Sequence, residues 1–442
     1  MMLLDLRASI ARGSGVVELP AGETHLDRPL VLPKNARNMT LRGNKAGSTL
    51  VLDSGFKGSA ALLVDGASNV TMEGFTVRGN RVELKSDWYF PLNEAAFADF
   101  YSDNGIVVRN SNHVVIRKVQ FRDLRAFSVL VNASSSVTID AVRIQDCGTL
   151  NRAGRNNTTG GILLEEGVSG FEVRRSAIDR ITGNAIWTHS YARSPRQADG
   201  VIQGNTITQV GRDAIQVGHA TRIRVEDNTG SELGFPAEYV DVEHHGVAVA
   251  VDTAGNVDHA VYARNRFTDV NGQCIDLDGF HDGEVTGNSC VNKKPLEAYP
   301  ASHYGIVFGN NDPGMNSTGV VVTGNTLQGF AYGAVFLAGS NNRIEDNQFL
   351  DINRAHCGST PVSARCNYAL EQPDLLRSGI YLSGNGGRAT TTTGNVIRSN
   401  TVTGFGMTHH CIAAGPGASM SENAVDANDC REPVIEKINP RR

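Results

Sequence analysis

The sequence has few aromatic residues, no long apolar run and no excess of positive charge. Phe, Tyr and Trp make up 6% of the 442 residues, whereas Gly is abundant at 48. This balance suits a narrow aliphatic core with many tight turns. No stretch reaches the roughly 18 apolar residues of a membrane-spanning helix. The formal net charge of −5 disfavours nucleic acid and anionic membranes as partners.

The N-terminal MMLLDLRAS is a poor signal peptide, because Asp5 and Arg7 interrupt its short apolar core. The seven cysteines include three plausible local pairs and one residue left alone, Cys147. Local pairing favours an oxidising compartment, so we expect a secreted or periplasmic protein, although spacing alone leaves the connectivity open. The three pairs are Cys274/Cys290, Cys357/Cys366 and Cys411/Cys430.

A repeating unit runs through most of the chain. Each copy has a strand with two inward aliphatic residues, a turn, a second strand of alternating Val and Ile, another turn and a third strand. The shortest spacing between copies is about 22 to 24 residues, and a variable excess is typical of insertions at turns. A helical pattern is confined to residues 93–101. The first inward aliphatic residues are Ile106, Val129, Ile162, Ile186, Ile215, Val249, Ile275, Ile306, Val335, Ile380 and Ile412.

Asparagine recurs at one phase of this repeat. Asn tolerates left-handed turns, and stacked Asn amides can hydrogen-bond from coil to coil, so we expect a structural ladder. The sequence therefore predicts an all-β protein, a single right-handed parallel β-helix of about 11 to 12 coils with loop insertions. Residues 16–60 form its N-terminal capping coil, 61–430 its coils and 431–442 a tail. The recurring residues are Asn205, Asn228, Asn265, Asn288, Asn325, Asn347 and Asn400.

This degenerate repeat resembles the pectin lyase-like superfamily of parallel β-helix proteins over residues 16–430. The resemblance implies work on extracellular polysaccharide, with the substrate lying along the sheet formed by the first strand of each copy. The superfamily includes hydrolases, lyases, epimerases, esterases and phage tailspikes, so membership leaves the reaction open.

Carboxylates cluster on the expected outer face of that sheet. In GVAVAVD, CIDLDG and GRDAIQV, the alternation of side chains points Asp252, Asp276 and Asp278 outward, with Asp213 just before its strand. We expect Asp252 and Asp278 to stack, with Asp276 to one side and Ala250 beside Gln216. Stacked carboxylates raise one another's pKa, the condition for pairing an acid with a base. The cluster is similar to polygalacturonase-type and tailspike hydrolases.

A groove of about 29 Å is expected along this face, from Trp187 to Tyr381. Flat rings stack on sugar faces, and loops on a rigid scaffold wall binding clefts. The insertions are 146–160, 190–199, 231–245, 292–303 and 354–377. We expect His281 to support the acids, and the candidate substrate-binding residues are Trp187, His189, Gln216, His219, Glu243, His244, Phe280, Asp282, Tyr304 and Tyr381.

These features predict a glycoside hydrolase in which Asp278 is the general acid and Asp252 and Asp276 serve as base or nucleophile. Basic residues are scarce among the outward-facing positions of this sheet. The Arg-Ile-Lys motif that binds a uronate in polygalacturonases is also missing, so a neutral glycan is favoured as substrate. A lyase or epimerase using Ca²⁺ held by the same acids, and a non-catalytic glycan-binding protein, are the alternatives. No cofactor is expected otherwise, and monomer or homotrimer stays open.

Overall fold

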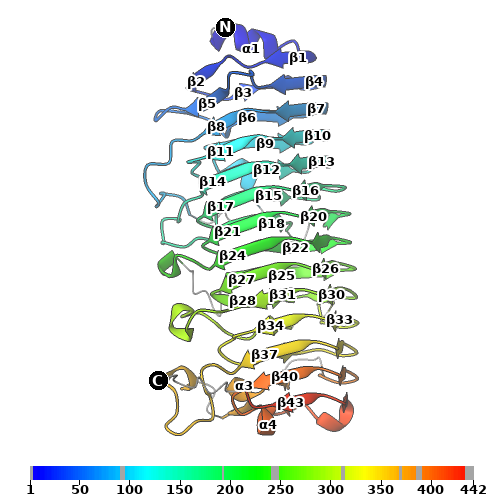
Figure 1. Ribbon diagram of the computed structural model, residues 1–442. Helices are drawn as coiled ribbons and strands as arrows, with labels where there is room; N and C mark the ends of the chain where they lie inside the picture. Colours follow the sequence, from blue (N-terminus) through cyan, green and yellow to red (C-terminus); the bar gives the residue numbers. More distant parts are fainter. Residues whose placement is uncertain are drawn as a thin grey trace.

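The computed structural model describes residues 3–89, 95–191, 194–239, 248–309, 314–367, 371–384 and 391–433. The chain winds into a solenoid of parallel strands, with the N-terminus at one end and the last coil at the other (Figure 1). Within the described residues, two sheets have 14 strands and a third has 15. The predicted parallel β-helix is confirmed. It has more coils than the expected 11 to 12, because residues 15–65 already contribute β1 to β6.

The first sheet consists of β1 (Gly15–Glu18), β4 (Arg37–Arg42), β7 (Ser68–Glu73), β10 (Asn112–Arg117), β13 (Ser135–Asp140), β16 (Glu172–Arg174), β20 (Val201–Gln203), β23 (Arg224–Glu226), β26 (Val261–Ala263), β30 (Glu284–Thr286), β33 (Val321–Thr323), β36 (Arg343–Glu345), β39 (Val396–Arg398) and β42 (Ala424–Asp426). The second consists of β2 (Gly22–Leu26), β5 (Ser48–Leu52), β8 (Thr76–Arg78), β11 (Gln120–Arg122), β14 (Arg143–Cys147), β17 (Ala177–Ile181), β21 (Thr206–Val210), β24 (Thr229–Leu233), β27 (Arg266–Val270), β31 (Ser289–Val291), β34 (Thr326–Gln328), β37 (Gln348–Ile352), β40 (Thr401–Gly404) and β43 (Asp429–Arg431).

The third sheet contains the strands that the sequence places first in each copy. It consists of β3 (Leu30–Val31), β6 (Ala60–Asp65), β9 (Asn104–Arg109), β12 (Phe127–Asn132), β15 (Gly160–Glu165), β18 (Asn184–His189), β22 (Ile215–Thr221), β25 (Ala248–Asp258), β28 (Gly272–Asp276), β32 (Ile306–Val307), β35 (Val335–Leu337), β38 (Ile380–Leu382) and β41 (Ile412–Ala414). Two short strands lie off this order: β19 (Gln197–Ala198) pairs with β22, and β29 (Phe280–His281) pairs with β25.

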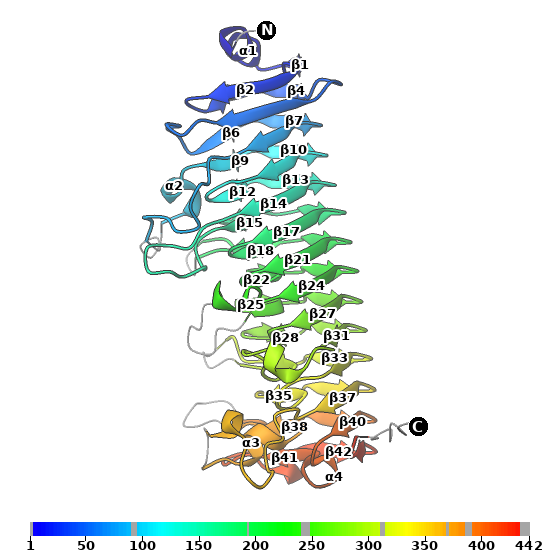
Figure 2. The same ribbon diagram turned by 60° about the vertical axis from the view of Figure 1, so that its left-hand side comes forward.

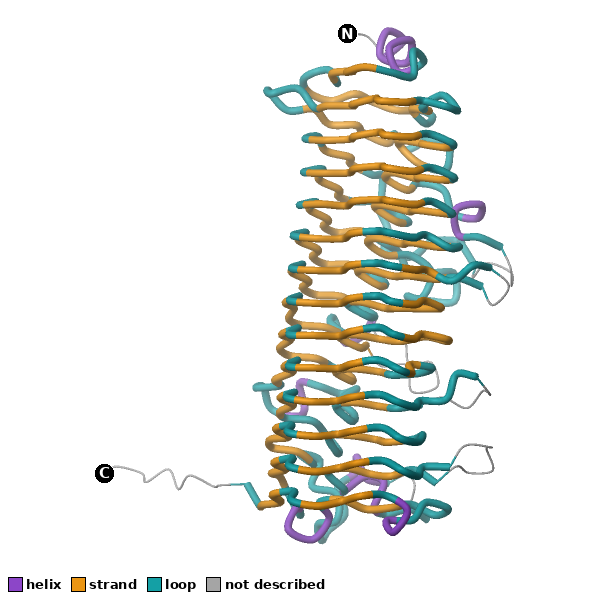
Figure 3. The backbone as a smooth tube through the Cα atoms, turned by 90° about the vertical axis from the view of Figure 1, so that its right-hand side faces the viewer, coloured by secondary structure: helices purple, strands orange, loops and turns teal. Residues whose placement is uncertain are grey.

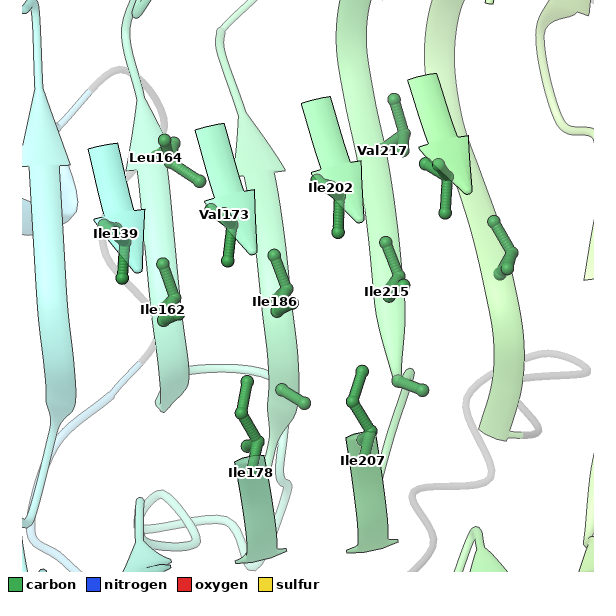
Figure 4. Packing of buried hydrophobic residues seen from close by; sticks show 14 of the residues in the cluster. Ile139, Ile162, Leu164, Val173, Ile178, Ile186, Ile202, Ile207, Ile215 and Val217 are labelled. Atoms are coloured by element: carbon green, nitrogen blue, oxygen red, sulfur yellow. The ribbon is translucent and has the colours of Figure 1, made fainter. Parts of the chain in front are cut away.

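Stacked aliphatic side chains fill the interior of the solenoid (Figure 4). On the third sheet Ile162, Ile186 and Ile215 pair in register and are fully buried. Because strand side chains alternate, each coil repeats the same inward set. Burying one such side chain contributes about 2 kcal/mol, so the stack is the main source of stability.

The asparagine ladder is confirmed and continues to Asn428. Each side-chain N–H donates to the Oδ1 of the next Asn, as in Asn265 Nδ2 to Asn288 Oδ1 at 2.9 Å. The ladder lies at the turn between the first and second sheets. The left-handed residue is the one before each Asn, for example Arg264 with φ 56°, so the Asn itself is selected for its amide. The remaining steps join Asn205, Asn228, Asn265, Asn288, Asn325, Asn347, Asn400 and Asn428.

Helices are short. α1 (Leu3–Ile10), which the sequence did not predict, buries Leu6 and Ile10 over the first coil. The helix expected within 93–101 is α2 (Phe97–Phe100). The others are α3 (Asp374–Arg377), α4 (Met407–His410), η1 (Ala237–Tyr239), η2 (Leu296–Ala298), η3 (Ala364–Cys366) and η4 (Met420–Glu422). None of the helices in the described part of the chain is both long and apolar enough to cross a membrane.

All three cysteine pairs that the sequence made plausible are disulfide-bonded, which settles the connectivity that spacing left open. Cys274–Cys290, Cys357–Cys366 and Cys411–Cys430 are bonded, and Cys147 is a buried free thiol. The pairs are consistent with an oxidising, extracellular environment.

The longer insertions lie beside the third sheet. Those after β8, β14, β24, β31 and β37 lead from the second sheet into the third. Figure 2 shows α2 and α3 on the same side of the solenoid, and Figure 3 shows the short turns stacked along one edge of the coils. The outer face of the third sheet is therefore the face that loops enclose.

Candidate functional site

The third sheet brings Gln216, Asp252 and Asp276 side by side on adjacent strands. Gln216 pairs with Asp252, and Val251 pairs with Ile275, which sets Asp252 beside Asp276. The expected pairing of Gln216 with Ala250 was wrong by two residues. The run Val-Ala-Val-Ala-Val allows this slip, because a shift of two residues keeps every side chain on its face.

Asp213 lies just before β22 and reaches the same group. Its Oδ1 accepts a hydrogen bond from the backbone N–H of Val249 at 3.1 Å, and its own N–H donates to Asn184 Oδ1 at 3.2 Å. Arg212 Nε lies 3.6 Å from Asp213 Oδ2. The Asp213 carboxylate is therefore buried at the start of β25 and held by both neighbouring coils.

An amide relay orients Asp252. Asn184 Nδ2 donates to Gln216 Oε1 at 2.9 Å, so the Gln216 amide turns its Nε2 toward Asp252 and donates to Oδ2. This arrangement assigns the donor and acceptor atoms of Gln216 without ambiguity. A hydrogen bond received on Oδ2 favours the ionised form of Asp252.

Burial and mutual repulsion raise the pKa of the carboxyl groups to different extents. Burial raises the pKa of Asp213 to about 6. Burial, and then the charge of Asp213, raise that of Asp252 to about 7. Burial, and then the charges of Asp252 and Asp278, raise the pKa of Asp276 well above its usual range. Asp276 Oδ1 is buried without a hydrogen-bond partner in the described residues, so Asp276 is the group that best retains a proton.

A cleft of about 350 Å³ is lined by Gln216, the hydrogen-bond partner of Asp252, and the aspartates lie beside its lining residues and not among them. The volume is at the lower end of the range for small-molecule sites. A Cβ on Gly255 would lie 2.7 Å from the His219 ring, so glycine lets this imidazole lie against the backbone. The lining residues are Asn157, Trp187, His189, Arg212, Gln216, Gly218, His219, Ala254 and Gly255.

Several expected site residues lie elsewhere. His281 pairs in register with Asp258, six residues beyond Asp252 on β25, and its ring contacts Asp282 Oδ2 at 3.0 Å and Asn256 Oδ1 at 3.1 Å. The rings of Phe280, Tyr304 and Tyr381 are buried and present no face to a ligand. Asp278 is partly buried two residues beyond Asp276. Glu243 and His244 lie outside the described residues.

The structure adds Asn184, Arg212 and Glu165, which sequence reasoning did not select. The adjacency of Arg212 to Asp213 in GRDAIQV was the available signal for Arg212. Asn184 stands two residues before Ile186, the same position that Asp213 holds before Ile215 on the next coil. Nothing in GILLEE distinguished Glu165 from an exposed strand residue.

Glu165 holds the insertion that precedes β9. Its carboxylate is fully buried and accepts hydrogen bonds from the backbone N–H groups of Phe97 at 2.9 Å and Ala98 at 2.8 Å, and from Asn132 Nδ2 at 3.0 Å. Atoms of Glu165, Glu166 and His189 that could ligate a metal ion lie within 4.8 Å of one another. The described aspartates do not form such a group. Because three donors already engage Glu165, this group fits an anchor for α2 better than a metal centre.

Replacing Glu165 with Ala should release α2 and expose both tryptophans. Phe97 packs edge-on against Trp187 at 5.1 Å, and Trp88 packs edge-on against Tyr101 at 5.3 Å, so both indoles report on this insertion. We expect a red shift of intrinsic fluorescence with far-ultraviolet circular dichroism unchanged. Glu172→Ala, at a surface ion pair with Arg174, is the matched control. An unshifted emission in Glu165→Ala would contradict the anchoring role.

Comparison with known proteins identifies the fold. Residues 60–235 and 245–431 match the family model described as the right handed beta helix region. No curated protein matches. Among solved structures, the surface adhesin PfbA of Streptococcus pneumoniae is 17% identical, with a TM-score of 0.55 over 79% of this chain and 86% of that one. DFA-IIIase from Arthrobacter chlorophenolicus A6 is 14% identical, with a TM-score of 0.53 over 93% and 87%.

The lacto-N-biosidase from Eubacterium ramulus is 13% identical, with a TM-score of 0.52 over 88% of this chain, which spans 62% of the length of that protein. At these identities the likeness concerns the fold alone. It agrees with the resemblance to the pectin lyase-like superfamily that the repeats and asparagines predict. The chain belongs to the right-handed β-helix family.

Proposed function

We propose that the protein is a glycoside hydrolase that acts through Asp276 and Asp252. The observation that carries this proposal is the stacking of Asp252 and Asp276 on adjacent strands, next to the cleft-lining Gln216 that donates to Asp252, with pKa values raised to different extents. Two titratable groups whose surroundings separate their pKa values are the requirement for acid and nucleophile roles.

Asp276 is the general acid in this proposal, in place of the Asp278 expected from the sequence. Asp276 carries the more strongly raised pKa and directly neighbours Asp252. Adjacent strands lie about 4.8 Å apart, close to the roughly 5 Å carboxyl separation of retaining glycosidases. Asp278 and Asp213 then act through their charges, which keep the proton on Asp276.

The reaction would proceed in two steps. The Asp252 carboxylate attacks the anomeric carbon as the glycosidic C–O bond breaks, and the Asp276 proton passes to the leaving oxygen. Water then attacks the glycosyl ester and gives a proton to the Asp276 carboxylate, which restores both groups. Gln216 holds Asp252 Oδ2 in place throughout.

The comparisons support a carbohydrate ligand without choosing the chemistry. Two of the similar structures bear enzyme names and one is a surface adhesin. A glycan partner and a secreted or periplasmic location, which the three disulfides favour, belong to the same proposal.

Hydrolysis should show a bell-shaped pH dependence with its acid limb near neutrality. The nucleophile must be ionised, so kcat/KM should rise as pH passes through about 6 to 7, where Asp213 and Asp252 lose protons. It should fall at higher pH as Asp276 ionises. Circular dichroism over the same range controls for unfolding. An acid limb near pH 4, the ordinary value for Asp, would contradict the buried pair.

A substrate panel tests the proposal itself. The protein is incubated with neutral and acidic polysaccharides, with and without a chelator, while reducing ends and ultraviolet absorbance of unsaturated sugars are followed. New reducing ends without absorbance, unaffected by the chelator, are expected. Calcium-dependent absorbance would indicate a lyase instead, and glycan binding without turnover would indicate an adhesin-like protein.

A further inference from the structure

We infer that the cleft receives the end of a glycan chain, or a short oligosaccharide, and does not accept a polymer lying along the solenoid. The expected groove of about 29 Å is not open, since described loops cover the third sheet on both sides of the aspartates. The mode of binding follows from these walls alone, whereas end-wise cleavage additionally depends on the proposed hydrolase function.

The first wall lies on the N-terminal side of the cleft. The outward-facing side chains Val107, Leu130 and Leu163 are completely buried. They pack in one apolar cluster with Phe97 and Tyr101 from the insertion before β9. The Glu165 carboxylate anchors this insertion through two backbone N–H groups. A sugar chain leaving the cleft in this direction would meet α2.

Trp187 marks the inner edge of this wall. Trp187 is 7% exposed as a residue, and its ring packs against Phe97 at 5.1 Å and His189 at 5.3 Å and still lines the cleft. The exposed part of the indole therefore closes the cleft at this end.

The second wall lies on the C-terminal side. Tyr304 and Tyr381 are buried in a cluster with Leu376 and the bonded pair Cys357 and Cys366. Tyr304 Oη donates to the Leu375 carbonyl at 2.5 Å, and Tyr381 Oη to Gln372 Oε1 at 2.9 Å. The described residues of the 354–377 insertion are thus tied to the sheet by hydrogen bonds and apolar contacts, and the disulfide cross-links the insertion internally.

Between the two walls, the strands on and beside which the aspartates lie span a short distance. From β22 through β25 and β28 to β32 there are three strand intervals, or about 14 Å. This length has room for a few sugar units beside the carboxylates. A chain end can enter between the walls, whereas an internal segment would have to pass through them.

Binding measured as a function of ligand length tests this inference separately from catalysis. We would titrate the Trp88→Phe/Asp276→Asn double variant with oligosaccharides of increasing length and follow tryptophan fluorescence. With Trp88 replaced, Trp187 is the remaining tryptophan that emits. The oligosaccharides come from the polysaccharide that the wild-type protein degrades or, if none is degraded, from each polymer of the panel. Affinity should stop rising after about three units, with less than about a threefold change per further unit.

The outcomes separate the two proposals. A plateau without hydrolysis by the wild type would sustain the closed cleft and reject the hydrolase. Affinity that keeps rising with length would overturn the closed cleft even if hydrolysis occurs. The absence of any fluorescence response would count against both.

Two variants of α2 provide the matched pair. Phe97→Ala removes the ring that packs on Trp187 and His189, so it should open the first wall and restore length dependence. Phe100 lies on the same short helix but is 38% exposed as a residue, so the plateau should persist in Phe100→Ala. Identical length profiles in the two variants would contradict the assignment of α2 as a wall.

Discussion

Replacing Asp276 with Asn is expected to lower kcat by about 10²- to 10⁴-fold and to stabilise the fold at alkaline pH. The loss of activity follows from removing the general acid. The gain in stability follows because folding raises the pKa of this carboxyl well above its usual range. A carboxyl whose pKa is raised by folding destabilises the fold increasingly as the pH rises above its pKa in the unfolded chain, which is near 4. The free energy of unfolding should therefore increase by about 1 to 2 kcal/mol at pH 8, seen as a higher melting temperature, and should hardly change at pH 4.

Asp227→Asn supplies the control. Asp227 is exposed at the asparagine turn, and its hydrogen bonds from Arg264 lower its pKa. Its substitution should leave activity intact and should not raise the melting temperature at pH 8. Retention of full activity in Asp276→Asn would remove Asp276 from the mechanism, and an unchanged melting temperature would show that the carboxyl is better solvated than the structure indicates.

Asn265→Ala should be among the most destabilising single substitutions, at about 3 to 5 kcal/mol. The Asn265 side chain donates to Asn288 Oδ1 and the Val225 carbonyl and accepts from Asn228 Nδ2 and N–H. Alanine leaves all four partners buried without this side chain, and each unsatisfied group carries a desolvation cost. Chemical denaturation followed by circular dichroism measures the loss.

Asn112→Ala is the comparison, because Asn112 is exposed on β10. Its effect should stay within about 0.5 kcal/mol. Similar destabilisation in the two variants would mean that the ladder adds little beyond ordinary solvated amides. Since coils contact only their neighbours, the denaturation curve should also reveal whether the coils on either side of Asn265 unfold together.

The fold could be predicted because each coil repeats the same pattern of buried and turn residues. Inward aliphatic residues such as Ile186 and Ile215 recur at a regular spacing, and the ladder asparagines recur at one turn. Local spacing also suggested the three cysteine pairs, although it left their connectivity open. The helix α1 escaped prediction because a single short segment has no repeat to reveal it.

The site could be predicted only in part. The cluster of aspartates was visible in the sequence. The strand register that places Asp252 beside Gln216 and Asp276 was not, because a register shifted by two residues fits the sequence pattern equally well. The aromatic residues Tyr304 and Tyr381 pointed outward as expected, yet the 354–377 insertion covers them. Whether a loop covers a strand or stands away from it is decided by tertiary packing, which periodicity does not record.

The insertions that shape the cleft lie at turns, outside the strands that form the scaffold. Each wall of the cleft leaves and rejoins the solenoid at a turn beside the third sheet, while the asparagine turn on the other side stays short. Lengthening or exchanging such a loop disturbs no strand register and carries only a small additional closure entropy. A lineage built on this coil could therefore acquire new ligand preferences by insertion and deletion at a few junctions, with the buried aliphatic stack and the carboxylates inherited unchanged.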